Sequence, residues 1–287
     1  MPVVRVNGID INYEVHGEGY PLVLAHGYTA SLRMWDDQIA TFAAKYRVAV
    51  YDSRGHGDTS APADMERYNL ARDYVGDQLA LMDHLGMERA HVGGLSMGGM
   101  IAQEFALRHP ERVKGLLLLD TGPGMAGIRR DPAIAARFEQ MRSMMQGLAR
   151  TKGMGAIVQA MRNSPMAFRP GGDVPLPAGV RRHGEGMLKM GVDGYLGGAR
   201  AMQDWAGSVE RLRELRMPAL VLVGEQDQLL PASRIIHSKI AGSRFALLRN
   251  CGHGSSVWRP DAAARVVMEF LADVDAGRAV AGEITVE

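Results

Sequence analysis

Gly94-Leu95-Ser96-Met97-Gly98 decides the fold, because it has the G-x-S-x-G pattern of a nucleophile elbow. A short, partly apolar run over 89–93 predicts a buried strand before it. A run with helical apolar spacing over 99–109 predicts a helix after it, with Pro110 as the stop. Such a strand–turn–helix would hold the serine in a strained backbone conformation with its hydroxyl exposed. The pattern also occurs in ordinary glycine-rich turns, so a functional interpretation needs further residues.

Length and composition indicate one large soluble α/β domain with an insertion. The chain has 287 residues, of which 46% are hydrophobic and 23% are charged. Its formal net charge is +1 and it has no basic stripe, so neither a nucleic-acid nor a membrane partner is expected. No apolar run approaches the ~20 residues that span a bilayer. The oligomeric state stays open, with a homo-oligomer among the alternatives.

Cysteine usage and the N-terminal segment favour a cytoplasmic protein. Cys251 is the one cysteine, so no intramolecular disulfide can form. The first seven residues, 1–7, show no charged segment followed by an apolar run, so no secretory signal is expected. The polar, glycine-rich loop 52–60 lacks the lysine of a phosphate-binding loop and is interpreted as structural, with Arg54 and Asp52 as a candidate pair. The chain has no HExxH or Cys-x-x-Cys motif, so neither a metal nor a cofactor is expected.

Strands and helices are predicted to alternate along most of the chain. After an N-terminal hairpin over 3–15, short apolar runs predict buried strands and longer runs with helical spacing predict helices. The strands are expected at 21–25, 47–51, 89–93, 113–120, 219–224 and 244–248, and the helices at 34–45, 70–85, 99–109, 232–240 and 261–274. This order implies a mainly parallel sheet with helices on both faces.

The alternation is interrupted over 121–215. This segment holds more than half of the chain's 19 methionines, many glycines and no convincing strand. Helices are predicted within it at 132–148 and 199–215. We therefore expect an α/β core made of 1–120 and 216–287, with 121–215 inserted as a helical cap. The tail, 275–287, is expected to be loosely ordered.

Three residues stand in the chain order of a catalytic triad. A serine needs a base to act as a nucleophile, and the base needs an orienting carboxylate. Asp227 follows a predicted strand at the carboxyl end of the sheet, where sites in open α/β sheets lie. His253 follows the last predicted strand and is flanked by glycines. Either one alone could be a solvated loop residue, but their order after Ser96 predicts the triad Ser96, Asp227 and His253.

Two other acids and one thiol are weaker candidates. Asp120 ends the predicted strand 113–120 and is the rival acid, and Glu225 is a third. Cys251 lies near the histidine but has no elbow, so we expect it to be a small packing residue.

Two backbone N–H groups are expected to stabilise the oxyanion that forms in acyl transfer. One belongs to Met97, the residue after the nucleophile. The other belongs to Tyr28, in the loop His26-Gly27-Tyr28-Thr29 that follows an early predicted strand. The His26 side chain itself is expected to make structural hydrogen bonds.

Together these motifs resemble the α/β-hydrolase fold superfamily over nearly the whole chain. The motifs are His26-Gly27, Asp52-x-Arg54-Gly55-x-Gly57-x-x-Ser60, the elbow with Gly99 after it, Gly224-Glu225-x-Asp227 and Gly252-His253. The resemblance implies the α/β-hydrolase fold: a mainly parallel central sheet, helices on both faces and an inserted helical cap. The elbow and the loop 52–60 look like those of the 3-oxoadipate enol-lactonase, non-haem haloperoxidase and small carboxylesterase group.

Three features of the sequence differ from particular subgroups of this superfamily and reduce the number of activities that the resemblance implies. Carbon–carbon bond hydrolases of the fold usually place a tryptophan after the catalytic histidine, whereas Gly254 follows here. Enol-lactonases often carry a glutamate a few residues after the histidine, where this chain has Ser255-Ser256-Val257-Trp258. Ser96 argues against haloalkane dehalogenases and epoxide hydrolases, which use an aspartate nucleophile.

The leading hypothesis is a cofactor-independent serine hydrolase that cleaves a small or medium carboxylic ester or lactone through an acyl-enzyme. An alternative keeps the triad but changes the reaction, as a C–C bond hydrolase of vinylogous diketones or a perhydrolase. A third hypothesis, a ligand-binding protein of this fold without turnover, is disfavoured by the intact triad. Because specificity depends on the cap and the pocket, these motifs do not name the small-molecule substrate.

Overall fold

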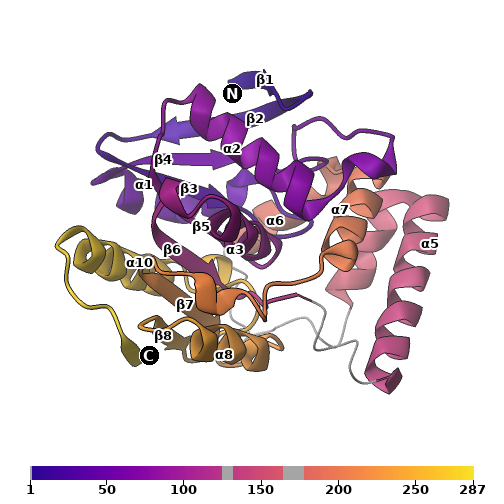
Figure 1. The fold of residues 1–287 in the computed structure, drawn as a ribbon. Coiled ribbons are helices and arrows are strands. Elements are labelled where there is room, and N and C mark those ends of the chain that lie inside the picture. Colours follow the sequence, from indigo (N-terminus) through magenta and orange to yellow (C-terminus); the bar gives the residue numbers. More distant parts are fainter. Residues whose placement is uncertain (1, 125–131, 164–177) are drawn as a thin grey trace.

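The computed structural model describes residues 2–124, 132–163 and 178–287. Within these ranges nine strands form one sheet in the order β1-β2-β4-β3-β5-β6-β7-β8-β9 (Figure 1). β2 pairs antiparallel with β1 and β4, and the other neighbours are parallel. The strands are β1 Val3–Val6, β2 Ile9–His16, β3 Tyr20–Ala25, β4 Tyr46–Tyr51, β5 Ala90–Leu95, β6 Val113–Leu119, β7 Ala219–Gly224, β8 Arg244–Leu248 and β9 Gly282–Val286. The predicted α/β class with a mainly parallel sheet is confirmed.

Helices cover both faces of this sheet. α1 (Asp36–Ala43) and α10 (Pro260–Asp275) bury Phe42 and Phe270 in the apolar cluster on one face. α2 (Val75–His84), α3 (Met97–Arg108) and α8 (Leu230–Lys239) bury Leu81, Ile101 and Ile236 in the cluster on the other. Shorter helices are η1 Leu32–Trp35, η2 Met65–Arg67, η3 Leu70–Tyr74, η4 Pro110–Arg112, η5 Leu212–Glu214 and α9 Ser255–Trp258. The central strands β5 and β7 are buried along their whole length. Every residue of β7 is apolar or glycine, as burial on both faces favours, and His91 is the one polar residue of β5.

Three further helices, called the cap helices below, lie beside the sheet: α5 (Pro132–Arg162), α6 (Ala178–Lys189) and α7 (Val192–Asp204). α5 and α7 lie to the right of the sheet in Figure 1. α5 is kinked at Gly153, whose φ of 70° and ψ of −175° are not helical. A third apolar cluster, which includes Ile157, Met187 and Tyr195, joins the cap helices to one another. Residues 125–131 and 164–177 of the predicted cap lie outside the described residues.

Two predictions of local structure were wrong. The helix expected at 199–215 is instead the last part of α7, which ends at Asp204. Trp205 is buried and donates a hydrogen bond to Glu104 of α3 (3.0 Å), and Gly207 adopts a φ of 85°, so the chain leaves the helix there. The tail is not loosely ordered, because β9 adds to the sheet beside β8.

The N-terminal hairpin formed as predicted around Asn7 and Gly8, which have φ of 48° and 75°. No helix in the ranges described above is long and apolar enough to cross a bilayer.

Candidate active site

Ser96 lies at the turn between β5 and α3 with a φ of 56° and a ψ of −112°. Its backbone N–H donates to the carbonyl of Leu119 at the end of β6 (2.9 Å). Its own carbonyl accepts from Met100 N–H (3.1 Å) and from the Thr121 hydroxyl (2.8 Å). These bonds hold the serine in a sparsely populated backbone region, so the strand–turn–helix expected from the sequence is present.

Glycines make this turn sterically feasible. A Cβ atom at Gly94 would lie 2.4 Å from the carbonyl carbon of Gly98, and one at Gly98 would lie 2.1 Å from the carbonyl oxygen of Ala25. Both distances are too short for any side chain. The start of α3 therefore approaches the end of β3 closely, which brings the loop after Ala25 beside Ser96.

His253 and Asp227 are joined directly. Nδ1 of His253 lies 3.0 Å from Oδ2 of Asp227, whose side chain is fully buried, and the other carboxylate oxygen accepts from Leu229 N–H (2.8 Å). The His253 side chain is 38% exposed, so its ring still faces accessible space. Within the described residues no hydrogen bond joins Ser96 to His253. Such contacts are often long before substrate binds, so the geometry permits the predicted role.

Asp120 links the end of β7 to the start of α9 by hydrogen bonds, next to the loops that carry Asp227 and His253. It follows β6 and is fully buried with a φ of 44°. One carboxylate oxygen accepts from Gly224 N–H at the end of β7 (3.1 Å), and the other accepts from Ser255 N–H at the start of α9 (2.6 Å). Glu225, the third acid considered, forms an ion pair with Arg249 (2.6 Å).

The two carboxylates set the charge around His253. Burial alone lowers the pKa of His253, but the hydrogen bond and charge of Asp227, together with the charge of Asp120, raise it above its ordinary value. Burial and the charge of Asp227 raise the pKa of Asp120 to about 6. The histidine is therefore basic enough to accept a proton, as a general base requires.

The loop after β3 makes hydrogen bonds to the loop 52–60 through His26 and to α7 through Tyr28. Nδ1 of His26 lies 2.7 Å from the carbonyl oxygen of Gly27, and Nε2 accepts from Ser53 N–H (2.9 Å), so the ring is structural as expected. The Tyr28 hydroxyl donates to the carbonyl of Tyr195 in α7 (2.6 Å). The two tyrosine rings stack with centroids 5.4 Å apart. The side chain of Tyr28 thus contacts a cap helix, while its backbone belongs to the loop beside Ser96.

Met97 begins α3, where backbone N–H groups have no acceptor within the helix. The position of this N–H agrees with the predicted oxyanion role, which stays a prediction together with that of Tyr28. Cys251 is fully buried, as expected of a packing residue, and burial raises the pKa of its thiol to about 12. In the part of the chain that the structure describes, no cluster of three His, Cys, Asp or Glu side chains could hold a metal ion.

The sequence did not single out His183 of α6, although it lies near this site. Burial, followed by the proximity of His253, lowers the pKa of His183 to about 4. His183 in turn contributes to the lowered pKa of His26, after the effect of burial. The sequence could have pointed to His183 only as a histidine on the inner face of an amphipathic helix. Which residues it faces depends on how α6 packs.

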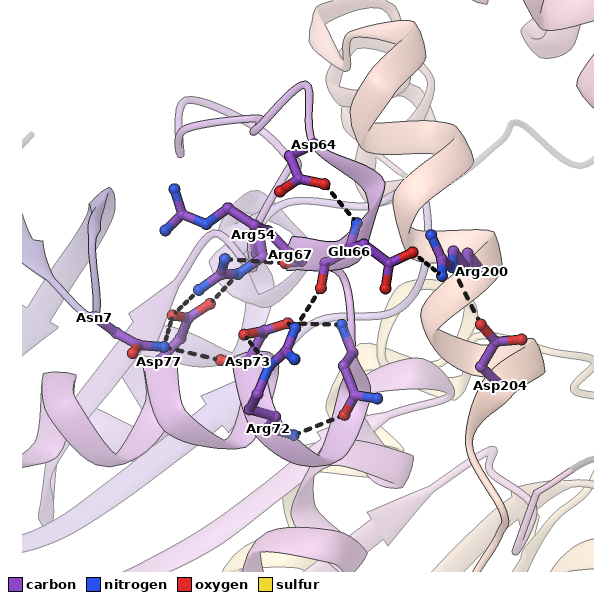
Figure 2. Close-up of polar contacts among 11 residues, drawn as sticks. Asn7, Arg54, Asp64, Glu66, Arg67, Arg72, Asp73, Asp77, Arg200 and Asp204 are labelled. Carbon is purple, nitrogen blue, oxygen red and sulfur yellow. Dashed lines mark hydrogen bonds and ion pairs between the residues drawn. The ribbon is translucent and has the colours of Figure 1, made fainter.

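The loop 52–60 pairs differently from the expectation. Arg54 forms a bidentate ion pair with Asp77 of α2, at 2.7 and 2.9 Å, rather than with Asp52 (Figure 2). Asp52 instead accepts from Asn12 and from the backbone of Leu32. Figure 2 also shows the polar contacts continuing to the cap, where Glu66 of η2 pairs with Arg200 of α7, which bonds Asp204 in turn.

Comparisons with known proteins agree with the fold described above. A family described as alpha/beta hydrolase fold matches residues 20–260. The 3-oxoadipate enol-lactonase 2 of Acinetobacter baylyi is 30% identical, over 88% of this chain and 90% of that protein. The 2-hydroxymuconate semialdehyde hydrolase of Pseudomonas sp. strain CF600 is 28% identical, over 94% of this chain and 93% of that protein.

Among solved structures, the enol-lactonase of Burkholderia xenovorans LB400 superposes with a TM-score of 0.79 at 28% identity. The match covers 94% of this chain and all of that one. The similarity to that structure therefore extends over nearly the whole chain.

Proposed function

Because the chain belongs to the α/β-hydrolase fold family, we propose that it is a cofactor-independent serine hydrolase that cleaves a carboxylic ester or lactone. One observation carries the proposal: the strained Ser96 turn shares one edge of the sheet with the hydrogen-bonded pair of His253 and Asp227. The likeness to two enol-lactonases supports the choice of substrate class.

In the proposed mechanism the Ser96 hydroxyl attacks the carbonyl carbon while His253 takes its proton. The N–H groups of Tyr28 and Met97 donate to the oxyanion that develops on the carbonyl oxygen. His253 then protonates the leaving alkoxide, which leaves an acyl group on Ser96. Water then attacks this ester with His253 again as the base. The bond between the acyl carbon and the Ser96 oxygen breaks, the carboxylic acid leaves, and His253 returns the proton to Ser96, while Asp227 fixes the imidazole tautomer throughout.

The cap helices bear on the size of the substrate. We propose that 121–215 forms a cap domain that covers the site and limits it to small or medium acyl groups. The contact between Tyr28 and Tyr195 supports this, because it links the loop beside Ser96 directly to α7.

The test is hydrolysis of a p-nitrophenyl ester series from acetate to decanoate by the wild type and by Ser96→Ala. We expect turnover to peak at short acyl chains and to fall at least ~10³-fold in Ser96→Ala. Intact-mass analysis of the wild type after rapid acid quench should show one added acyl group. Ester turnover that is equal in both proteins would overturn the proposal.

A C–C bond hydrolase is the second candidate, supported by the likeness to the 2-hydroxymuconate semialdehyde hydrolase. The position after His253 argues against it. Gly254 has a φ of 96°, a conformation that tryptophan or any other L side chain adopts only with strain. Turnover of a ring-fission dienoate well above that of every ester would favour this candidate instead.

A further inference from the structure

The inner face of α6 is directed at the proposed active site. Gly179, His183 and Gly186 lie one helical turn apart, so they share a face of the helix. A Cβ atom at Gly179 would lie 3.2 Å from Val257 of α9, and one at Gly186 would lie 3.2 Å from the Ser31 hydroxyl. Both approaches are close, so α6 is packed firmly against the core on this face.

These two contacts lie on either side of His183 along α6, and each involves a residue close in sequence to a predicted site residue. Val257 lies four residues after His253, and Ser31 lies three residues after Tyr28. His183 therefore lies on α6 between a contact with α9, which follows the loop of His253, and a contact with the loop that follows Tyr28. The electrostatic influence of His253 on His183, and of His183 on His26, is an independent sign of the same position.

His183 is partly exposed, and its ring carries hydrogen-bonding nitrogens. Among the residues that the structure describes, none accepts or donates a hydrogen bond with it. Its pKa of about 4 leaves it neutral at physiological pH, with one N–H donor and one nitrogen acceptor. A proton on this ring would also repel the imidazolium that His253 must form during the reaction, so neutrality suits the site.

We infer that His183 is a substrate-binding residue that hydrogen-bonds an uncharged oxygen of the substrate beyond the scissile carbonyl group. The inference rests on the proposed function and refines its substrate class. It assigns to the protein esters or lactones with an ether, keto or hydroxyl oxygen near the reacting carbonyl, in preference to plain alkyl esters or to carboxylates.

The test uses three p-nitrophenyl esters of nearly equal size: pentanoate, 3-methoxypropanoate and the succinate half-ester. The first two differ only by a methylene group replaced with oxygen, and the third carries a carboxylate. Each kcat/KM is divided by the rate of hydroxide-catalysed hydrolysis, which removes the intrinsic reactivity of the ester. The proteins are the wild type, His183→Phe, His183→Leu and His183→Gln. The control is His84→Phe, which makes the same kind of substitution at an exposed histidine of α2.

We expect the wild type to prefer the methoxy ester over the pentanoate, and this preference to fall about three- to tenfold in His183→Phe and His183→Leu. His183→Gln retains a donor and an acceptor and should restore it, while His84→Phe should leave it unchanged.

An unchanged preference in both apolar variants, with turnover still dependent on Ser96, would overturn the inference but not the proposed function. A wild-type preference for the succinate half-ester would also overturn it, because a carboxylate would then be the ligand. Turnover of all three esters equal to that of Ser96→Ala would overturn the proposed function itself, and this inference with it.

Discussion

The proton affinity of His253 determines the pH range in which the proposed hydrolase works. Its pKa is raised above the ordinary 6.5, since Asp227 and Asp120 outweigh the opposite effect of burial. The base must be neutral to accept the serine proton, so kcat/KM should fall as the pH drops through this raised pKa. We expect the midpoint of the acidic limb above pH 6.5, measured with a neutral ester.

The same limb should move to lower pH in Asp227→Asn, because the substitution removes the hydrogen bond and charge that raise the pKa of His253. A midpoint that stays in place or rises would contradict the assignment of Asp227 as the orienting acid.

A matched pair of variants separates the two buried acids. Asp227→Asn should lower kcat about 10³- to 10⁴-fold, because the imidazole loses its tautomer and its counter-charge. Asp120→Asn should lower kcat less than tenfold yet cost about 1–3 kcal/mol of unfolding free energy, since one of two buried N–H groups loses its acceptor. Steady-state kinetics and urea denaturation of both variants check this. The reverse ranking of kcat would make Asp120 the catalytic acid.

The sequence was most informative at the residue scale. Ser96, Asp227 and His253 each follow an apolar run that predicts a strand, and parallel strands end at one edge, so their proximity could be anticipated. His183 could not be found this way, because the glycines on its face of α6, Gly179 and Gly186, meet residues of other elements that are distant in the sequence. Only the packing of α6 brings those segments together.

At the scale of elements, the hydrogen bond between Tyr28 and Tyr195 connects α7 to the loop beside Ser96. Tyr28→Phe removes this bond but keeps the ring. We expect kcat for a short ester to fall about three- to tenfold with little change in KM, because the loop's N–H would be less well placed for the oxyanion. Tyr13→Phe, on β2, is the control and should behave as the wild type. A change confined to KM would instead indicate a role in substrate binding.

Strands were predicted better than the helix at 199–215 and the tail, for physical reasons. β6 and β7 are almost wholly buried, so their sequences are mostly apolar and predict strands clearly. The segment 205–215 has helical apolar spacing, but Trp205 finds its partner on α3 and Gly207 turns the chain away. β9 is largely exposed and has two apolar residues, Ile284 and Val286, which make a weak strand signal. It pairs with β8 at the edge of the sheet.

At the scale of the whole molecule, the buried pair of Arg54 and Asp77 fixes the loop 52–60 against α2. Arg54→Met should cost about 3–5 kcal/mol of unfolding free energy, because it leaves a buried carboxylate without its cation. Adding Asp77→Leu should recover part of this loss. Urea denaturation measures both, with Arg5→Met as the control, since its pair with Asp10 is exposed. A loss no larger than the control's would contradict the expectation.

The sequence did not predict that Asp77 is the ion-pair partner of Arg54, because Asp52 lies only two residues before Arg54 in the chain. Both acids are buried, and what separates them is the set of donors each one meets. Asp52 already accepts from Asn12, Leu32 and Asp58, whereas Asp77 meets Arg54 and Asn7. Charge pairing between distant elements follows from the finished fold and not from local spacing.

The strained backbone of Ser96 has an evolutionary consequence. A φ of 56° at a serine costs about 1–3 kcal/mol that glycine would largely avoid. Selection for stability alone therefore favours glycine at this position, and only selection for turnover opposes it. A descendant released from its substrate should lose this serine early, while the glycines around it persist because the crossing of α3 and β3 still requires them.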